Sequence, residues 1–166
     1  MQYINTSAYL FVALSVSELP ILRTQLKEKA DSCQLKGTIL LSTEGINSFL
    51  SGTRENIDAY KAFLSTFSFF KGMHYKESLS NDQPFSRMLV RLKKEIISMG
   101  QEEIQPEKKR AAYISPEKLK AWYEEKKDMI VLDTRNDYEI DLGSFDGAMD
   151  LNIETFRDFP NAVSLL

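Results

Sequence analysis

The 166-residue sequence has one cysteine and one histidine, and these two shortages exclude several kinds of site. With Cys33 alone the chain cannot form an internal disulfide bond, and with His74 as its single imidazole it cannot build a Cys/His zinc site. A Ser-His or Cys-His catalytic pair would need one of these residues, and neither lies in a pattern typical of an activated nucleophile. We therefore expect Cys33 to be a buried small residue and His74 to be a loop residue packed among aromatic side chains.

Long apolar runs and a strong charge of either sign are also missing. No segment approaches the ~20 apolar residues that a membrane-spanning helix needs, and the first residues lack the pattern of a secretion signal. The net charge is −3, while 43% of the residues are hydrophobic and 27% are charged. This composition predicts a folded, soluble, cytoplasmic protein, and it disfavours both disorder and binding of a polyanion by the whole chain.

The charges that are present divide unevenly along the chain, which predicts two domains. Residues 1–95 contain 12 basic and 9 acidic residues, a net charge of +3, whereas residues 96–166 contain 9 and 15, a net charge of −6. The stretch from Gly100 to Arg110 is poor in apolar residues. We predict a first domain over residues 1–99, a linker over 100–111 and a second domain over 112–166.

Hydrophobic patterning in the first domain predicts four strands and two helices. Ser17 is the expected N-cap of the first helix, in which Pro20 occupies the first turn, and Thr53 is the expected N-cap of the second. Strands are expected over 7–14, 36–42, part of 44–52 and 87–93. The resulting order, βαββαβ, is that of an α+β ferredoxin-like fold, which acylphosphatases share.

The second domain begins with a helix start and continues as an α/β unit. Ser115 is the expected N-cap and Pro116 the first helical residue. Residues 129–133 form a nearly all-apolar run, which is typical of a parallel strand covered on both faces. A short strand over 148–152 and a helical stretch over 154–163 follow, so we expect only the first, truncated part of an α/β domain before Leu166.

Two pairs of polar residues are candidate functional sites. Asp133 and Arg135 follow the apolar strand, at the edge where parallel sheets place their sites, although a structural ion pair would explain them equally well. Glu44 and Asn47 lie in a turn that contains a glycine. This turn could present both side chains to a substrate, or Asn47 could simply stabilise it.

A strand with alternating cations is the candidate RNA contact. Met88, Val90 and Leu92 alternate with basic residues, which predicts one buried face and one solvated face. Clustered cations attract nucleic-acid phosphates, but a merely solvated strand face has the same pattern. The candidate RNA-binding residues are Lys36, Arg87, Arg91, Lys93 and Lys94.

Several spaced motifs together resemble one family. Residues 36–47 (KGTILLSTEGIN), 87–95 (RMLVRLKKE), 133–139 (DTRNDYE) and 155–160 (TFRDFP) are similar to segments of the rhodanese-like bacterial tRNA uridine(34) hydroxylases. The resemblance implies a partial rhodanese-like second domain and an oxygen-dependent hydroxylation of the wobble uridine of tRNA to 5-hydroxyuridine by the full-length protein. Asp133 and Arg135 would then be supporting residues that flank the active-site loop.

The same resemblance implies where the catalytic residue lies. In that family the reactive cysteine follows the segment 155–160 at some distance, so we expect it beyond Leu166, and we expect this chain to be an inactive N-terminal portion. The implied partner is tRNA and the implied cosubstrate is molecular oxygen. The sequence contains no flavin or nicotinamide glycine fingerprint and no set of metal ligands, so it indicates no metal.

Two other functions are compatible with these residues. A sulfurtransferase that works through a cysteine persulfide would use the same rhodanese-like half, and a non-catalytic RNA-binding or interaction module would need only the first domain. An acylphosphatase is disfavoured, because the first strand-helix junction over residues 13–18 has neither an arginine nor a glycine-rich loop to hold phosphate.

Overall fold

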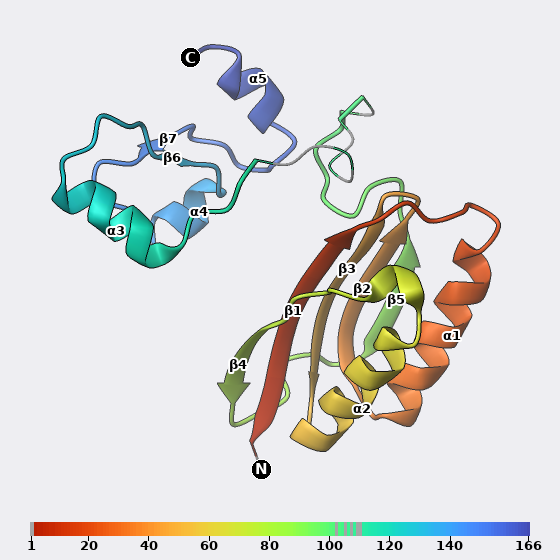
Figure 1. Cartoon of the computed structure of the whole chain (residues 1–166). Coiled ribbons are helices and arrows are strands. Elements are labelled where there is room, and N and C mark those ends of the chain that lie inside the picture. The colour runs from red at the N-terminus through yellow and green to blue at the C-terminus, as the bar shows by residue number, and fades with distance from the viewer. Residues whose placement is uncertain (1, 102, 105, 107, 109–110) are drawn as a thin grey trace. The chain divides into compact units, whose positions relative to one another are not determined.

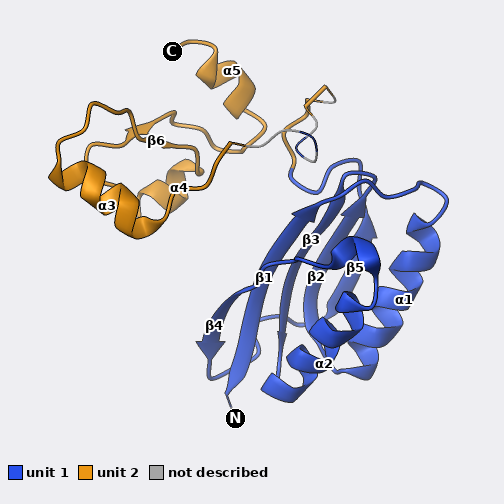
Figure 2. Ribbon diagram, viewed as in Figure 1, with its two compact units in different colours: residues 1–97, 105–108 blue, residues 98–104, 109–166 orange. Residues whose placement is uncertain are grey.

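The computed structural model describes residues 2–101, 103–104, 106, 108 and 111–166. The chain divides into two compact units: unit 1 comprises residues 1–97 and 105–108, and unit 2 comprises residues 98–104 and 109–166 (Figure 2). Five positions of the predicted linker, 102, 105, 107, 109 and 110, lie outside the described residues. The domain boundaries at 99 and 112 stay a prediction, and the two units are described separately.

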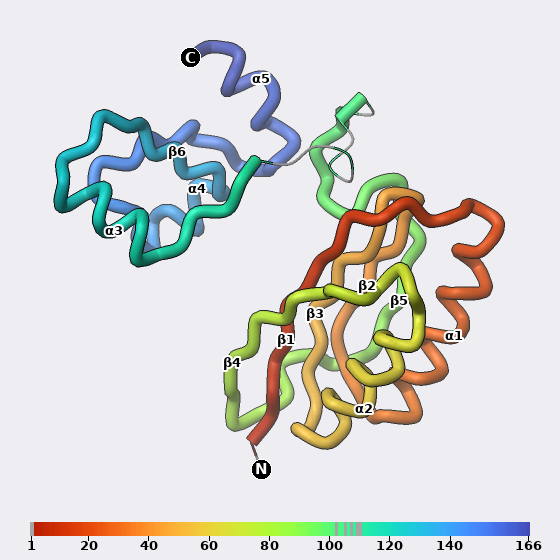
Figure 3. The backbone as a smooth tube through the Cα atoms, viewed as in Figure 1, coloured from red at the N-terminus to blue at the C-terminus, as the bar shows by residue number. Residues whose placement is uncertain are grey.

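Unit 1 is a five-stranded sheet with helices on one face (Figures 1 and 3). The strand order is β4-β1-β3-β2-β5, and neighbours are antiparallel except β2 and β5, which run parallel. The first four strands and two helices form the predicted ferredoxin-like arrangement, and β5 is an additional edge strand. The strands are β1 Tyr3–Phe11, β2 Lys36–Ser42, β3 Gly45–Gly52, β4 Lys76–Ser80 and β5 Met88–Leu92.

The core of unit 1 lies between the sheet and its helices, α1 (Leu19–Ser32) and α2 (Arg54–Ser65), the latter followed by the short helix η1 (Ser68–Phe70). Leu26 on α1 and Ile39 on β2 are both 0% exposed, and the other apolar residues at alternate strand positions and at helical spacing join them. Complete burial of a Leu or Ile side chain contributes about 1.5–3 kcal/mol, so this layer is the main source of stability in unit 1.

The two helix starts turn out differently from each other. The predicted cap of α2 is confirmed, because the Thr53 side chain accepts a hydrogen bond from the Asn56 backbone N–H. The predicted cap of α1 is wrong, since the N-cap is Glu18. The Ser17 hydroxyl instead bonds the Ser15 hydroxyl at 2.8 Å, because a turn that closes on the Ser15 carbonyl precedes the helix.

The last predicted strand of unit 1 needs a larger correction. Residues 88–92 do form a strand, but it is the fifth and pairs with β2 at one edge. The fourth strand is β4, which the sequence did not reveal and which pairs with β1 at the opposite edge. Apart from Leu79, every residue of β4 is polar, so the apolar alternation that identifies a strand is missing there.

The described part of unit 2 contains three short helices and a short parallel pair of strands. The predicted cap Ser115 is confirmed, because its side chain accepts a hydrogen bond from the Lys118 backbone N–H. The two strands run parallel, with Leu132 opposite Met149 and Asp133 opposite Asp150. The elements are α3 Pro116–Glu124, β6 Leu132–Asp133, α4 Asp137–Ile140, β7 Met149–Asp150 and α5 Phe159–Val163.

The predicted buried strand over 129–133 is much shorter in the structure. Only Leu132 and Asp133 form strand β6, and Ile130 is 79% exposed. A parallel strand becomes buried when neighbouring strands and helices cover it, and among the described residues β6 has β7 as its single strand neighbour. The apolar run therefore identifies a strand position whose covering layers unit 2 does not supply.

Candidate functional site

Asp133 and Arg135 form a bidentate ion pair at the end of β6. The Arg135 Nε lies 3.0 Å from Asp133 Oδ1, and its Nη2 lies 2.7 Å from Oδ2. The Arg135 backbone N–H donates a further hydrogen bond to Oδ1 at 3.2 Å. Asp133 is 7% exposed, whereas the Arg135 side chain is 43% exposed, so the pair joins a buried carboxylate to a guanidinium at the surface.

This ion pair also fastens the loop that follows α4. The Ser144 hydroxyl donates to Asp133 Oδ2 at 2.6 Å, and Arg135 Nη2 donates to the Gly143 carbonyl at 2.7 Å. Hydrogen bonds from Arg135 and then Ser144 hold the pKa of Asp133 well below its usual range. Asp133 is therefore a carboxylate at neutral pH, and it accepts hydrogen bonds from both Arg135 and Ser144.

Glu44 and Asn47 are joined through a third residue, Ile96. The Asn47 side-chain amide donates to the Ile96 carbonyl at 3.0 Å, and the Glu44 carboxylate accepts from the Ile96 backbone N–H at 2.5 Å. Ile96 itself is 1% exposed. Glu44 lies in the β2-β3 turn as predicted, whereas Asn47 lies on β3. Both side chains hold the segment that follows β5 against this hairpin, and their substrate-facing role stays a prediction.

The five predicted basic residues do not form one cluster. Lys36 and Arg87 lie next to each other, one position before the first paired residues of β2 and β5. Lys93 and Lys94 follow the far end of β5, and at about 3.3 Å per residue roughly 20 Å of strand separates Arg87 from Lys93. Arg91 is exposed and lies opposite Leu40 of β2. The predicted patch is therefore two groups at the two ends of a strand pair.

The sheet of unit 1 has a second face, opposite α1 and α2, which we call the open face. Paired strand residues share a face, so the register defines its side chains. They include exposed aromatic residues: Tyr9 is 43% and Phe49 is 48% exposed. The other positions of the open face are Tyr3, Asn5, Ser7, Phe11, Lys36, Thr38, Leu40, Ser42, Asn47, Ser51, Lys76, Ser78, Ser80, Leu89 and Arg91.

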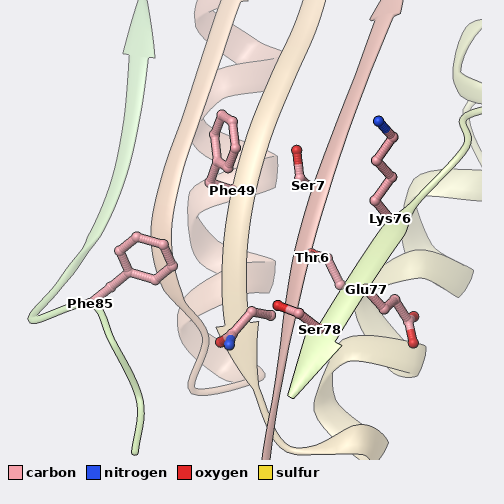
Figure 4. A pocket seen from close by; sticks show the side chains of 8 residues that line it. Thr6, Ser7, Phe49, Lys76, Glu77, Ser78 and Phe85 are labelled. Atoms are coloured by element: carbon pink, nitrogen blue, oxygen red, sulfur yellow. The ribbon is translucent and has the colours of Figure 1, made fainter. Parts of the chain in front are cut away.

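A hollow of about 200 Å³ lies on the open face beside Phe49 (Figure 4). Phe85 reaches it from the loop between β4 and β5, and Lys76 and Ser7 line it as well. No sequence pattern identified Lys76, because β4 was not predicted, and none identified Phe85, which lies in a loop. Phe49 could have been found as an aromatic residue at an outward position of a predicted strand.

Two further features are relevant to possible catalysis: the burial of Cys33 and the hydrogen bonding of the loop between β1 and α1. Cys33 is 5% exposed, which confirms the expected buried residue, and His74 is exposed. In the β1-α1 loop the backbone N–H groups of Val12 and Leu14 donate to carbonyls of the β2-β3 turn at 2.9 Å each. These two amides are therefore already bonded within unit 1.

The described residues contain no group of three His, Cys, Asp or Glu side chains arranged to hold a metal ion. Over the same residues no helix combines the length and apolar character needed to cross a membrane.

Comparison with known proteins decides the family. The UPF0176 acylphosphatase-like domain matches residues 3–96, which is all of the sheet of unit 1. The chain belongs to the UPF0176 family. A solved acylphosphatase from Coxiella burnetii is similar over 54% of this chain and 93% of its own, with 16% sequence identity and a TM-score of 0.39.

Similarity of this UPF0176 chain to curated relatives extends through both units. It is 45% identical over 98% of its length to a protein of Cupriavidus pinatubonensis named tRNA uridine(34) hydroxylase. It is 47% identical over 99% of its length to the protein of the same name from Cupriavidus metallidurans. In both comparisons the chain spans 59% of the length of the relative.

Proposed function

We propose that this chain belongs to a tRNA uridine(34) hydroxylase, in which unit 1 helps to hold the RNA and the whole protein converts the wobble uridine to 5-hydroxyuridine with molecular oxygen. One observation carries the proposal: identity of 45–47% runs through 98–99% of the chain. The acylphosphatase-like domain accounts only for residues 3–96, so the similarity includes unit 2 as well. A shared RNA-binding domain alone would not explain that extent.

Unit 2 would contribute the first elements of a rhodanese-like domain. Its parallel pair β6-β7, with helices between and after the strands, is compatible with such a beginning. Asp133 and Arg135 would act there by fixing the end of β6 to the loop at Gly143 and Ser144. They would thus position the backbone around an active-site loop without touching the reacting uridine.

A persulfide mechanism through Cys33 itself has little support. It needs an accessible thiolate, and the single cysteine of the chain, Cys33, is 5% exposed in the core of unit 1. The same burial predicts that the 166-residue chain alone does not modify tRNA through a thiol.

A chimeric protein tests the proposed function directly. In the Cupriavidus metallidurans relative, the part that matches this chain is replaced by residues 1–166, and the chimera is expressed in a bacterial strain that lacks 5-hydroxyuridine. We expect mass spectrometry of digested tRNA to detect 5-hydroxyuridine with the chimera and with the intact relative, but not with the 166-residue chain. A chimera that folds and accumulates normally but forms no 5-hydroxyuridine contradicts the proposal.

A further inference from the structure

The open face of unit 1 combines aromatic side chains with one sign of charge. Lys36, Lys76 and Arg91 are its charged residues, and none of its described positions is acidic. The covered side differs at the same strand, because Glu77 on β4 faces α2 and pairs there with Arg54 and Lys61. The charged side chains that the register places on the open face are therefore all basic, although the whole chain carries a net charge of −3. Glu77 also borders the hollow beside Phe49, but its carboxylate is paired with Arg54 and Lys61.

Two aromatic residues of this face stand at diagonal positions. Tyr9 pairs with Asn47 and Phe49 pairs with Ser7, so Tyr9 and Phe49 are neighbours across β1 and β3, with Cα atoms about 7–8 Å apart. On the other side of β3, Gly37 of β2 allows close approach of the backbones, because it has a φ of +136° and a Cβ there would lie 2.0 Å from the Phe49 carbonyl oxygen. Phe49 therefore stands on a central strand that is paired on both sides.

The hollow beside Phe49 has the size and lining for a small flat group. Its volume of about 200 Å³ is below the ~300–1,000 Å³ of pockets that hold drug-sized ligands. Phe85 borders it, and the loop that carries Phe85 is fastened by a hydrogen bond from the Gln83 side chain to the Ser51 carbonyl at 2.9 Å. Asn5 also lines the hollow, and its Oδ1 has no hydrogen-bond partner among the described residues.

These features are complementary to unpaired RNA. Base stacking needs exposed aromatic rings, phosphates need cations, and a carboxylate on the surface would repel the backbone. In a duplex the faces of the bases are stacked on one another, so Phe49 and Tyr9 could not stack on them and would add no affinity. A second copy of this chain would bring its own Lys36, Lys76 and Arg91 to the interface, and like charges oppose that contact.

We propose that the open face binds a single-stranded RNA segment, with one base stacked on Phe49 in the hollow next to Phe85 and with phosphates bound by Lys36, Lys76 and Arg91. The identity of this RNA as the anticodon loop rests on the proposed function, whereas binding of unpaired RNA does not. The open face would then hold the loop splayed out, which is the state in which a single base becomes accessible to an enzyme.

The experiment measures fluorescence anisotropy of a short fluorescein-labelled oligouridine with the 166-residue chain over a series of salt concentrations. We expect the single strand to bind more tightly than the same oligouridine annealed to oligoadenosine. Phe49→Ala should lower the affinity about tenfold and leave the salt dependence unchanged, because stacking is lost and no phosphate contact is. Lys76→Ala should instead reduce the slope of log K against log salt by roughly 0.7.

Matched variants separate stacking from other effects. Phe49→Leu keeps an apolar side chain but removes the ring, and it should lose most of the affinity lost by Phe49→Ala. Phe145→Ala removes a ring that is 58% exposed in unit 2, and it should change nothing. If circular dichroism shows that Phe49→Ala does not fold, Phe85→Ala provides the same comparison from a loop position.

Three results would overturn the inference. Affinity for oligouridine that is unaffected by both Phe49→Ala and Phe85→Ala removes the stacking role. Equal binding of duplex and single strand shows that only charge is recognised. Sedimentation as a dimer that Phe49→Ala dissociates, without any effect on RNA binding, shows that a second copy covers the face. If the chimera forms no 5-hydroxyuridine but the chain still binds oligouridine, the proposed function is disproved while RNA binding by the open face is retained.

Discussion

Units 1 and 2 are stabilised in different ways. Unit 1 has a continuous hydrophobic core whose central residues, such as Leu26 and Ile39, are completely buried. Among the described residues of unit 2, Ile153 and Asp133 are the buried side chains, and large apolar residues such as Leu142 are 89% exposed. Unit 1 is therefore held by apolar burial, and unit 2 depends heavily on one ion pair with its hydrogen bonds.

The difference in burial between the two units implies different functional properties. A buried core makes the sheet of unit 1 a rigid support, so side chains on its open face are presented in fixed positions. Unit 2 exposes large apolar side chains such as Leu142, so its stability should respond to whatever packs on them. The following predictions test whether the two units are really independent in this way.

The largest effect should come from the core of unit 1. Leu26→Ala removes a fully buried side chain and should lower the free energy of unfolding of unit 1 by about 2–5 kcal/mol. Denaturant unfolding followed by far-ultraviolet circular dichroism measures it. The single tryptophan, Trp122, lies in unit 2, so its fluorescence reports on that unit separately.

Leu79→Ala is the control for this change, because Leu79 is 59% exposed and its truncation should cost no more than about 0.5 kcal/mol. If the Trp122 transition moves together with the circular dichroism transition in Leu26→Ala, the two units unfold as one. The two units would then not be stabilised independently.

The second prediction concerns the ion pair of unit 2. Asp133→Asn removes the negative charge that Arg135 and Ser144 contact, and it should lower the denaturant midpoint of the Trp122 transition while leaving the unfolding of unit 1 unchanged. Asp141→Asn is a matched control, since Asp141 is an exposed residue at the end of α4. Equal midpoints for the two variants would show that the pair does not hold unit 2 together.

Local signals in the sequence predicted several parts of the fold that depend on neighbouring residues, although the α1 cap at Ser17 was wrong. Residues 36–42 were predicted as a strand and form β2 with those bounds. The caps Thr53 and Ser115 were identified from residue type and position, because capping is a bond within one helical turn. The burial of Cys33 followed from its residue type alone.

Long-range properties were not predicted. Strand 88–92 was recognised from its alternation, but its place at the β2 edge depends on β4 occupying the β1 edge, and β4 has no apolar pattern. The candidate site shows the same limit. The bonds that tie Glu44 and Asn47 to Ile96 join residues 49 and 52 positions apart, and no local pattern reveals them.

A smaller effect is expected at the β2-β3 turn. Glu44→Ala removes the carboxylate that accepts the Ile96 N–H, and Asn47→Ala removes the donor to the Ile96 carbonyl. Each change should cost about 1 kcal/mol and speed amide hydrogen exchange at Ile96. Glu44→Gln retains an acceptor oxygen and should leave exchange nearly unchanged.

These variants also separate the structural role of the turn from a substrate-facing one. If Glu44→Gln in the chimera abolishes 5-hydroxyuridine formation while exchange at Ile96 stays slow, the carboxylate acts on the substrate. If Glu44→Gln retains modification and only Glu44→Ala loses it, the turn acts by holding the segment after β5.

The smallest effect should appear in the acid unfolding of unit 1. Hydrogen bonds from Arg54 and then Lys61 lower the pKa of Glu77 from 4.5 to about 2. A carboxylate whose pKa is lower in the folded state stabilises that state above its unfolded pKa, and the contribution is lost as the pH falls from about 4.5 to about 2. Glu77→Gln should therefore reduce the stability of unit 1 at pH 7 and flatten the decline of that stability between pH 4.5 and pH 2.

The effect of Glu77→Gln should be small. Because the Glu77 and Arg54 side chains are 30% and 51% exposed, water and salt screen the pair, and the folding equilibrium should change by less than about fivefold. Thermal unfolding of both proteins at pH 7 and pH 2.5 measures this, and parallel acid profiles would show that the pair contributes nothing to the stability of unit 1.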